Sequence, residues 1–378
     1  MPAIKAVFEN IYQGKTILIT GDTGFKGSWL SIWLKLLGAK VVGYSAYLPS
    51  NPCLFSACNI NNHIKHIQGD IRDYDALKKV FKQYEFDFVF HLAAQPIVTR
   101  AYLDPKATFE TNILGTVNVL ECVRKFSDNA VAVMITSDKC YKNMGWSWGY
   151  RETDHLGGND PYSASKACAE LVCQSYVKSF SDRPKNAFSM ATARAGNVIG
   201  GGDWAIDRII PDCIRAWSNN KAVYIRNPKA TRPWQHVLEP LSGYLWLAQK
   251  LSQSNRLNGE SFNFGPDYKD SASVGELIKI FSKYFGGNNK WRYLNKAEPK
   301  ESMFLKVSSD KALKYLDWYA VLPFSDTIKM TAEWYKNYYK KHSNTSRSKG
   351  SEILDFTIGQ IKSYIDEAQK NNLKWASE

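Results

Sequence analysis

No apolar stretch of this 378-residue sequence approaches the ~20 residues needed to cross a membrane. The start of the chain also lacks the charged segment followed by an apolar one that marks a secretion signal. Apolar residues make up 44% of the chain, which suits the core of a globular protein with two domains. We therefore expect a soluble protein that works in the cytoplasm without a membrane partner.

The sequence also lacks a cysteine pattern. Its seven cysteines have irregular spacing, which fits neither a disulfide framework nor a zinc site. The close histidine pair, His63 and His66, has no cysteine or acidic residue at ligand spacing, so we interpret it as surface decoration. The sequence thus predicts a reducing compartment and no metal.

Blocks of like charge are lacking too, although the net charge is +13. A basic surface is typical of proteins that bind nucleic acid, but here the lysines and arginines are scattered and no nucleic-acid motif is present. Positive charge also suits an enzyme whose small ligands carry phosphate groups. We expect no nucleic-acid partner.

A glycine-rich loop near the start is the first motif that indicates chemistry. Residues 16–20 (TILIT) read as a buried strand, and residues 21–27 (GDTGFKG) follow it and open an apolar helix. Glycines at this place allow a tight turn and a close approach to a pyrophosphate, which the helix N-terminus favours electrostatically. The context predicts a dinucleotide site that includes Gly21, Thr23, Gly24, Phe25, Lys26 and Gly27.

The choice between NAD and NADP stays open at the next strand, residues 40–44. Such a strand commonly ends with an acidic residue that binds the adenosine ribose, but Ser45 stands there. Lys26 in the glycine loop leaves room for a 2′-phosphate, while the ordinary interpretation of this lysine is a solvated side chain.

Tyr162 and Lys166 form a candidate base. Their four-residue spacing puts a phenol and an ammonium on one face of a helix. A neighbouring cation and a positively charged nicotinamide would both lower the pKa of the phenol toward the working range. Such a tyrosine can take a proton from a sugar hydroxyl while hydride leaves the carbon. A half-buried tyrosine beside an extended lysine is the structural alternative.

Strand and helix patterns alternate through the first half of the chain, which predicts an α/β fold with a doubly wound, parallel Rossmann-type sheet. We expect a dinucleotide-binding domain over residues 1–196, with a returning segment near 225–265. A smaller C-terminal substrate domain should cover mainly residues 197–342. A polar linker, about residues 342–350, and a C-terminal helix complete the expected segment 343–378.

Further motifs follow in a familiar order, and they are these: Gly69-Asp70, His91-Leu92-Ala93-Ala94, Thr111-Asn112 and Arg194-Ala195-Gly196-Asn197. With them, the chain resembles the extended short-chain dehydrogenase/reductase family up to about residue 340. Within it, four segments resemble the CDP-glucose 4,6-dehydratases: residues 24–30 (GFKGSWL), 136–141 (TSDKCY), 197–204 (NVIGGGDW) and 232–237 (RPWQHV).

The resemblance implies NAD as the cofactor and CDP-glucose as the substrate. These enzymes oxidise the sugar at C4, eliminate water across C5 and C6, and return hydride to C6. Elimination needs an acid near the C6 hydroxyl and a base near C5. Asp138, beside Ser137, is the expected acid. Related dehydratases have glutamate as the presumed base at the next position, but this chain has Lys139. Either Lys139 is the base, or it pairs with Asp138 and another base acts.

The resemblance also assigns the remaining site residues. Additional cofactor contacts are expected from Asp70, Ile71, Leu92, Ala93, Ala94 and Thr111. Substrate contacts are expected from Gln95, Asn197, Arg208 and Arg232, of which Arg208 is the more suited to a structural ion pair. The aromatic segment 146–150 (WSWGY) forms either a lid or packing under a loop. The helices near residues 106–124 and 162–180 should form a four-helix homodimer interface.

Two other classes stay open. A sugar-nucleotide 4-epimerase would share the tyrosine, the lysine and the cofactor loop, but its product would have unchanged mass. A non-catalytic NAD-binding protein would keep the loop and could lose Tyr162, so the presence of Tyr162, Lys166 and Asp138 argues against it.

Overall fold

The computed structural model describes residues 7–180, 188–267, 271–286, 290–293, 305–342 and 349–377. Within these ranges, no helix has the length and apolar character required to cross a membrane. All seven cysteines lie in them and are free thiols, as the irregular spacing predicts.

Seven parallel strands form the central sheet in the spatial order β11-β6-β5-β4-β1-β2-β3. The strands are β1 (Thr16–Thr20), β2 (Lys40–Ser45), β3 (Lys65–Gln68), β4 (Phe88–His91), β5 (Val131–Ile135), β6 (Ser189–Ala195) and β11 (Ser261–Phe264). This order, with β1 and β4 adjacent at the centre, is that of a doubly wound dinucleotide-binding fold. The predicted fold class is confirmed.

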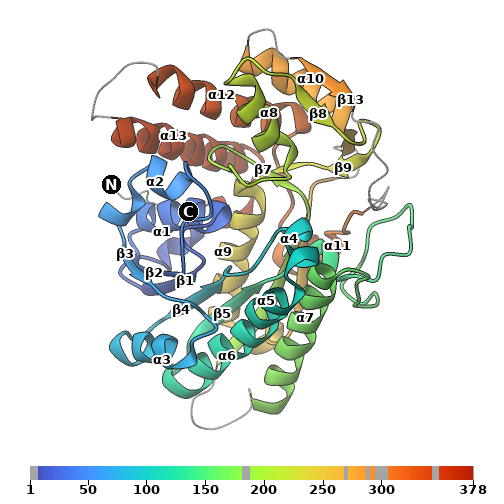
Figure 1. Ribbon diagram of the computed structural model, residues 1–378. Helices are drawn as coiled ribbons and strands as arrows, with labels where there is room; N and C mark the ends of the chain where they lie inside the picture. The colour runs from blue at the N-terminus through green and yellow to red at the C-terminus, as the bar shows by residue number, and fades with distance from the viewer. Residues whose placement is uncertain are drawn as a thin grey trace.

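Helices cover both faces of the sheet (Figure 1). One face packs on α3 (Tyr74–Gln83), α6 (Gly115–Phe126) and α7 (Pro161–Phe180), and the other packs on α1 (Phe25–Leu36) and α9 (Leu238–Gln253). Successive strand residues point to opposite faces, so Leu18 joins the first core while Ile17 and Ile19 join the second. Burial on both faces explains why the strands read as continuous apolar runs.

The helix expected near residues 106–124 has an irregular middle. Short helices α4 (Val98–Leu103) and α5 (Pro105–Phe109) precede a π-helical turn, η3 (Glu110–Leu114), which continues into α6. Side chains of this turn reach the loop after β4, because the Asn112 amide donates to the Gln95 carbonyl oxygen at 3.1 Å and to Ser165 Oγ at 2.8 Å. The turn thereby connects β4 to α7.

The second half of the chain contributes both to the sheet and to a smaller lobe. Helix α9 and strand β11 belong to the sheet region, and α11 (Asp310–Leu316) packs on both. The smaller lobe contains α8 (Ile209–Trp217), α10 (Val274–Phe285), α12 (Phe324–His342) and the strand pairs β7 (Val198–Ile199) with β10 (Gln235–His236), β8 (Val223–Ile225) with β13 (Trp291–Tyr293), and β9 (Thr231–Pro233) with β12 (Ser271–Ser273).

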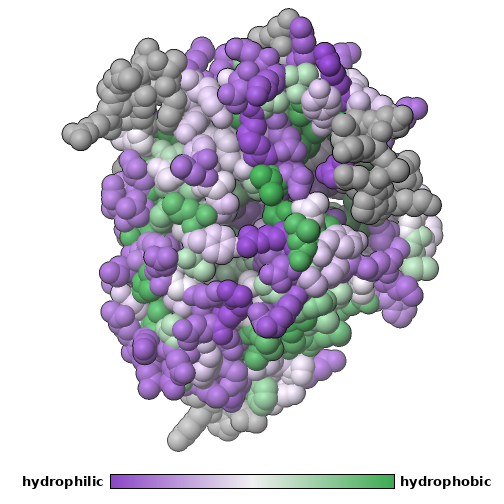
Figure 2. Space-filling model, in the orientation of Figure 1, coloured by the Kyte–Doolittle hydropathy of each residue, from purple (hydrophilic) through white to green (hydrophobic). Residues whose placement is uncertain are grey.

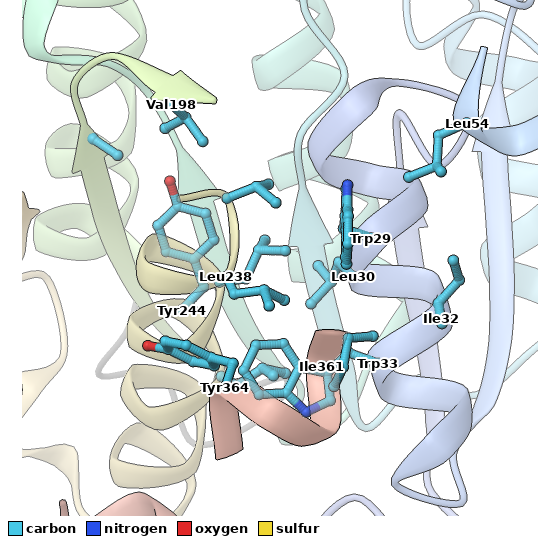
Figure 3. Close-up of a cluster of buried hydrophobic side chains, with 14 of the residues drawn as sticks. Trp29, Leu30, Ile32, Trp33, Leu54, Val198, Leu238, Tyr244, Ile361 and Tyr364 are labelled. Atoms are coloured by element: carbon cyan, nitrogen blue, oxygen red, sulfur yellow. The ribbon is translucent and has the colours of Figure 1, made fainter. Parts of the chain in front are cut away.

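The C-terminal helix α13 (Lys349–Lys370) packs on α1, on α2 (Leu54–Ala57) and on the neighbouring α12 (Figure 1). Figure 3 shows Trp33 of α1, Leu238 of α9 and Tyr364 of α13 turned toward one another. The outer face of α1 is therefore covered, which explains why α1 is apolar on more than one stripe. Most of the predicted polar linker, residues 343–348, lies outside the described residues.

Candidate active site

Loops from the carboxyl ends of six strands converge on a cavity of about 1250 Å³, which also contacts the smaller lobe. Ligands of doubly wound sheets bind at this edge. The cavity is lined by every residue that the sequence predicts for a site, namely Gly21, Thr23, Gly24, Phe25, Lys26, Gly27, Ser45, Asp70, Ile71, Leu92, Ala93, Ala94, Gln95, Thr111, Ser137, Asp138, Lys139, Tyr162, Lys166, Asn197, Arg208 and Arg232.

The glycine loop has the shape that close approach to a phosphate requires. Gly21 has a φ of +80°, and a Cβ there would lie 2.7 Å from the Ala93 nitrogen. A Cβ on Gly27 would lie 2.0 Å from the Gly21 carbonyl oxygen. Within the described chain, no side chain caps α1 at Gly24. A backbone cradle at a helix N-terminus fits the pyrophosphate of a dinucleotide.

One part of the cavity is lined by Asp138, Tyr162 and Lys166 and is called the reaction end here. Lys26 extends toward this reaction end rather than toward a ribose. Its Nζ donates to the Tyr244 hydroxyl at 3.3 Å. Burial lowers the pKa of Lys26 to about 7, with Arg208 and Lys166 acting in the same direction and Asp138 opposing them. This position matches neither a 2′-phosphate partner nor a solvated lysine, because α9 supplies a buried acceptor that the loop sequence does not reveal.

Ser45 is buried at the end of β2, and its hydroxyl donates to the Asp22 carboxylate at 2.5 Å. The other oxygen of Asp22 lies 2.7 Å from His66 Nδ1. The interpretation of His66 as surface decoration is therefore wrong: strand β3 turns its ring inward, where it pairs with a fully buried carboxylate. Among the described residues, no cluster suits a metal ion.

The loops after β3 and β4 form the next part of the wall. Asp70 binds Arg72 with both carboxylate oxygens, at 3.1 and 2.6 Å. The side chain of Gln95 holds its own loop, because Oε1 accepts from the Ile97 nitrogen at 2.7 Å and Nε2 donates to Thr108 Oγ1 at 2.9 Å. Gln95 lines the cavity, but both polar atoms of its side-chain amide make hydrogen bonds within the loop region.

Asp138, Ser137 and Tyr162 lie together in the reaction end, all nearly buried. Asp138 begins the single turn η4 (Asp138–Cys140) directly after β5, and Ser137 Oγ donates to its Oδ1 at 2.9 Å. Burial raises the pKa of Asp138, while Lys139, Ser137, Lys26 and Arg232 oppose the shift. A carboxyl held toward its protonated form can act as an acid.

The titration of Tyr162 is dominated by burial. Burial raises the pKa of Tyr162 to about 12, and a hydrogen bond with Ser137 and the charge of Arg208 only partly oppose this. The predicted lowering by Lys166 and a bound nicotinamide concerns the protein with its cofactor, whereas among the side chains alone desolvation is the larger effect. The neighbouring Lys166 responds in the opposite sense, because burial lowers its pKa to about 8 against the charge of Glu170.

A buried ion pair supports Lys166 from below. Glu170, one turn further along α7, pairs with Arg194 of β6 at 2.8 Å, and both side chains have no exposed surface. Thr136 and Thr192 also donate to the Glu170 carboxylate. These contacts fix α7, and with it Tyr162 and Lys166, against the ends of β5 and β6.

Lys139 is half-buried beside Asp138 and lines the cavity. Its backbone nitrogen donates to Ser137 Oγ at 3.2 Å. Within the described residues, no ion pair joins the Lys139 ammonium to the Asp138 carboxylate. The charge of Lys139 is nevertheless the largest effect that opposes the raised pKa of Asp138, so Lys139 as the base and Lys139 as the electrostatic partner of Asp138 both fit this geometry.

Two of the predicted substrate residues, Arg208 and Arg232, belong to the smaller lobe. Arg208 precedes α8 and pairs with Asp203 at 3.4 Å while 37% of its side chain stays exposed, so the ion pair leaves donors available to the cavity. Arg232 lies on β9 and contributes to the field at Asp138. Asn197 follows β6, next to Gly196, where a Cβ would lie 3.2 Å from Asp138 Oδ2.

The aromatic segment 146–150 packs under its own loop rather than over the cavity. The rings of Tyr141, Tyr150, Trp146 and Trp148 stack in succession, with centroids 5.2 to 5.4 Å apart. Tyr150 is 1% exposed, whereas Trp148 is 56% exposed. Of the two interpretations of the segment, aromatic packing describes the structure.

Sequence reasoning missed Asp22, His66, Tyr244 and Glu170. Glu170 had a signal, since it stands four residues after Lys166 and eight after Tyr162 on one helix face. Asp22 and His66 had none, because their contact depends on the pairing of strands that are distant in sequence. Tyr244 looks like one more apolar position of α9.

Several known proteins are similar to this chain. The sequence model of the family described as GDP-mannose 4,6 dehydratase matches residues 18–331. A CDP-glucose 4,6-dehydratase of Salmonella typhimurium is 42% identical over 92% of this chain and 98% of its own length. A human dTDP-D-glucose 4,6-dehydratase is 25% identical over 88% and 93%. The structure of the Streptomyces venezuelae dTDP-glucose 4,6-dehydratase DesIV has a TM-score of 0.72 at 22% identity, over 85% and 97%.

Proposed function

Since the chain belongs to the GDP-mannose 4,6-dehydratase family, we propose that it is an NAD-dependent lyase that converts CDP-glucose to CDP-4-dehydro-6-deoxy-D-glucose. The Salmonella CDP-glucose enzyme, at 42% identity over most of the chain, supports the choice of substrate. The observation that carries the proposal is the buried Asp138 carboxyl beside Ser137 and Tyr162. An enzyme that used only Tyr162 and Lys166 for oxidation and reduction of the sugar would not need this acid.

The wall of the cavity fits NAD. Its pyrophosphate suits the glycine cradle from Gly21 to Gly27, and Ser45, Asp70 and Ile71 line the adenosine end. Leu92, Ala93, Ala94, Thr111, Tyr162 and Lys166 line the stretch that continues toward the reaction end. NAD, when bound, accepts a hydride from the sugar and later returns it.

Tyr162 and Lys166 serve the oxidation at C4. Tyr162 acts as the phenolate, which takes the proton of the C4 hydroxyl while hydride leaves C4, and the charge of Arg208 favours this phenolate. The Lys166 ammonium adds positive charge, and burial lowers its pKa only to about 8, so most of the population is charged at neutral pH.

Asp138 and Lys139 serve the elimination. The C4 ketone makes the C5 proton acidic, and Asp138 gives a proton to the departing C6 hydroxyl. Lys139, the neighbouring cavity residue, takes the C5 proton when its amine is in the neutral form. Arg208 and Arg232 bind the diphosphate of the substrate, while Asn197 and Gln95 contact its sugar.

We also propose a homodimer that works in the cytoplasm. Figure 2 shows an apolar area over the region where Figure 1 draws α5 and α7. On α4 and η3, which both contact α7, and on α7 itself, Leu103, Leu114 and Leu171 are 87%, 56% and 54% exposed. Two copies that pack these helices together would bury the area in a four-helix interface. The free thiols suit a reducing compartment.

The proposed activity is tested with a panel of nucleotide sugars. The purified protein with NAD is incubated with CDP-, dTDP-, UDP- and GDP-linked hexoses, and the products are analysed by mass spectrometry. We expect CDP-glucose to give a product one water lighter. A product of unchanged mass would instead identify a 4-epimerase, and water loss only from another nucleotide sugar would exclude CDP-glucose.

A further inference from the structure

The network behind Ser45 is built from three neighbouring strands. Asp22 follows β1, Ser45 ends β2 and His66 lies on β3. Gly43 of β2 pairs with Ile19 of β1 on one side and with His66 of β3 on the other, so it lies between strands β1 and β3. A Cβ on Gly43 would be 2.1 Å from Asp22 Oδ2. The absent side chain of Gly43 therefore allows the Asp22 carboxylate to lie next to the His66 ring.

This network determines how Ser45 can interact with a ligand. Its hydroxyl proton goes to Asp22 at 2.5 Å, and its oxygen accepts from the Thr23 nitrogen at 3.3 Å. Toward the cavity, Ser45 can act only as an acceptor. A ribose 2′-hydroxyl can donate to such an oxygen, whereas a 2′-phosphate dianion has no proton to give.

Charge at this end acts in the same direction. The Asp22 carboxylate is fully buried, so it is poorly screened and repels a phosphate. Arg72, a cation at the same end of the cavity, is already bound by both oxygens of Asp70. Lys26, the cation of the glycine loop, donates to Tyr244 at the reaction end.

We propose that Asp22, acting through Ser45, makes this chain select NAD over NADP. Asp22 replaces in space the acidic residue that commonly ends the second strand, although it comes from the glycine loop. It is a positioning residue, because it orients and polarises Ser45 without reaching the cavity surface. The inference rests on the proposed function, in which the adenosine half of NAD lies beside Ser45.

The test measures binding of the adenosine half alone. Isothermal titration of nucleotide-free protein with ADP-ribose and with 2′-phospho-ADP-ribose gives two Kd values and their ratio, without any turnover. Wild-type protein should prefer ADP-ribose. In Asp22→Asn, the preference should fall by about tenfold or more, mainly because the 2′-phosphate ligand binds more tightly. A purely structural role would weaken both ligands together and leave the ratio unchanged.

Asp87→Asn is the matched control. Asp87 accepts from Lys15 Nζ and from the Thr16 nitrogen at 2.8 Å each. These contacts lie at the amino ends of β1 and β4, away from the cavity. Its substitution makes the same carboxyl-to-amide change and should leave the ratio of Kd values unaltered. A folded Asp22→Asn protein with the wild-type ratio would overturn the inference.

His66→Arg decides the matter if Asp22→Asn does not fold. The His66 side chain is 24% exposed, so a guanidinium has room beside Asp22, where it neutralises the carboxylate. The preference for ADP-ribose should again fall, and an unchanged ratio would refute the role of Asp22. Equal binding of the two ligands by wild-type protein would contradict this inference alone. Failure of the wild-type protein to bind either ligand would contradict the proposed function.

Discussion

The hydroxyl of Ser137 connects the groups that the proposed reaction uses. It donates to Asp138 Oδ1, accepts from the Lys139 nitrogen and makes a hydrogen bond with Tyr162. The base for the C4 hydroxyl proton and the acid for the C6 hydroxyl therefore share one neighbour. A change in the charge of Tyr162 alters the field at Asp138, since burial leaves little solvent to screen it.

Three substitutions should separate the steps of the reaction. Tyr162→Phe should slow oxidation at C4 by roughly 10² to 10⁴-fold, because the proton acceptor is gone. Asp138→Asn and Lys139→Met should still allow oxidation in a single turnover but should block water loss. If Lys139 is the C5 base, its variant should also lose exchange of the C5 hydrogen with solvent deuterium. Absorbance at 340 nm follows the oxidation step, and mass spectrometry follows the loss of water and the exchange with deuterium.

Lys142→Met is the control for Lys139→Met, because Lys142 is exposed and lies only three residues along the chain. Its exchange rate should equal that of the wild type. Wild-type exchange in Lys139→Met would leave this lysine as an electrostatic partner and would require another base.

At the scale of elements, the position of α7 depends on the Glu170–Arg194 pair. Glu170→Gln should leave the Arg194 charge without a partner in a site with no exposed surface. We expect a loss of roughly 3 to 5 kcal/mol in the free energy of unfolding, measured by urea denaturation. Activity at low temperature should also fall, because Lys166 loses its fixed position.

The comparison for this prediction is Glu121→Gln on α6. Glu121 pairs with Arg124 at 2.8 Å and is 18% exposed, so water can replace part of the lost interaction, and we expect a cost of about 1 kcal/mol or less. Equal losses in the free energy of unfolding of the two variants would show that burial does not increase the cost of breaking the Glu170–Arg194 pair.

The strands could be predicted because their signals are local, whereas most of the predicted site residues came from the resemblance, and all of them line one cavity. Residues 16–20 and 40–44 have apolar runs bounded by glycine and polar residues, and the observed β1 and β2 agree within one residue. The contact of Asp22 with His66 could not be predicted, since it needs the register of three strands. The direction of Lys26 and the pKa of Tyr162 depend on burial, which a local sequence pattern does not contain.

For the whole molecule, the apolar area over α5 and α7 gives a test of assembly. Leu114→Glu combined with Leu171→Glu should shift sedimentation from dimer to monomer at micromolar concentration, because two charges would be buried in the interface. Leu313→Glu, at a leucine of α11 that is 50% exposed, should leave the assembly unchanged. A wild-type protein that sediments only as a monomer would contradict the proposed dimer.

The packing of α13 on α1 has a consequence for biosynthesis. Just beyond α13, Trp375 stacks on Phe8 with ring centroids 5.0 Å apart, and both residues are fully buried. The outer side of the cofactor-binding half therefore stays uncovered on the ribosome until residue 375 has been synthesised. At roughly 5 to 20 residues per second, the interval between synthesis of Trp33 and synthesis of Trp375 is about 20 to 70 s. During that time, Trp33 and its apolar neighbours are exposed, so this protein should depend on chaperones that protect nascent chains.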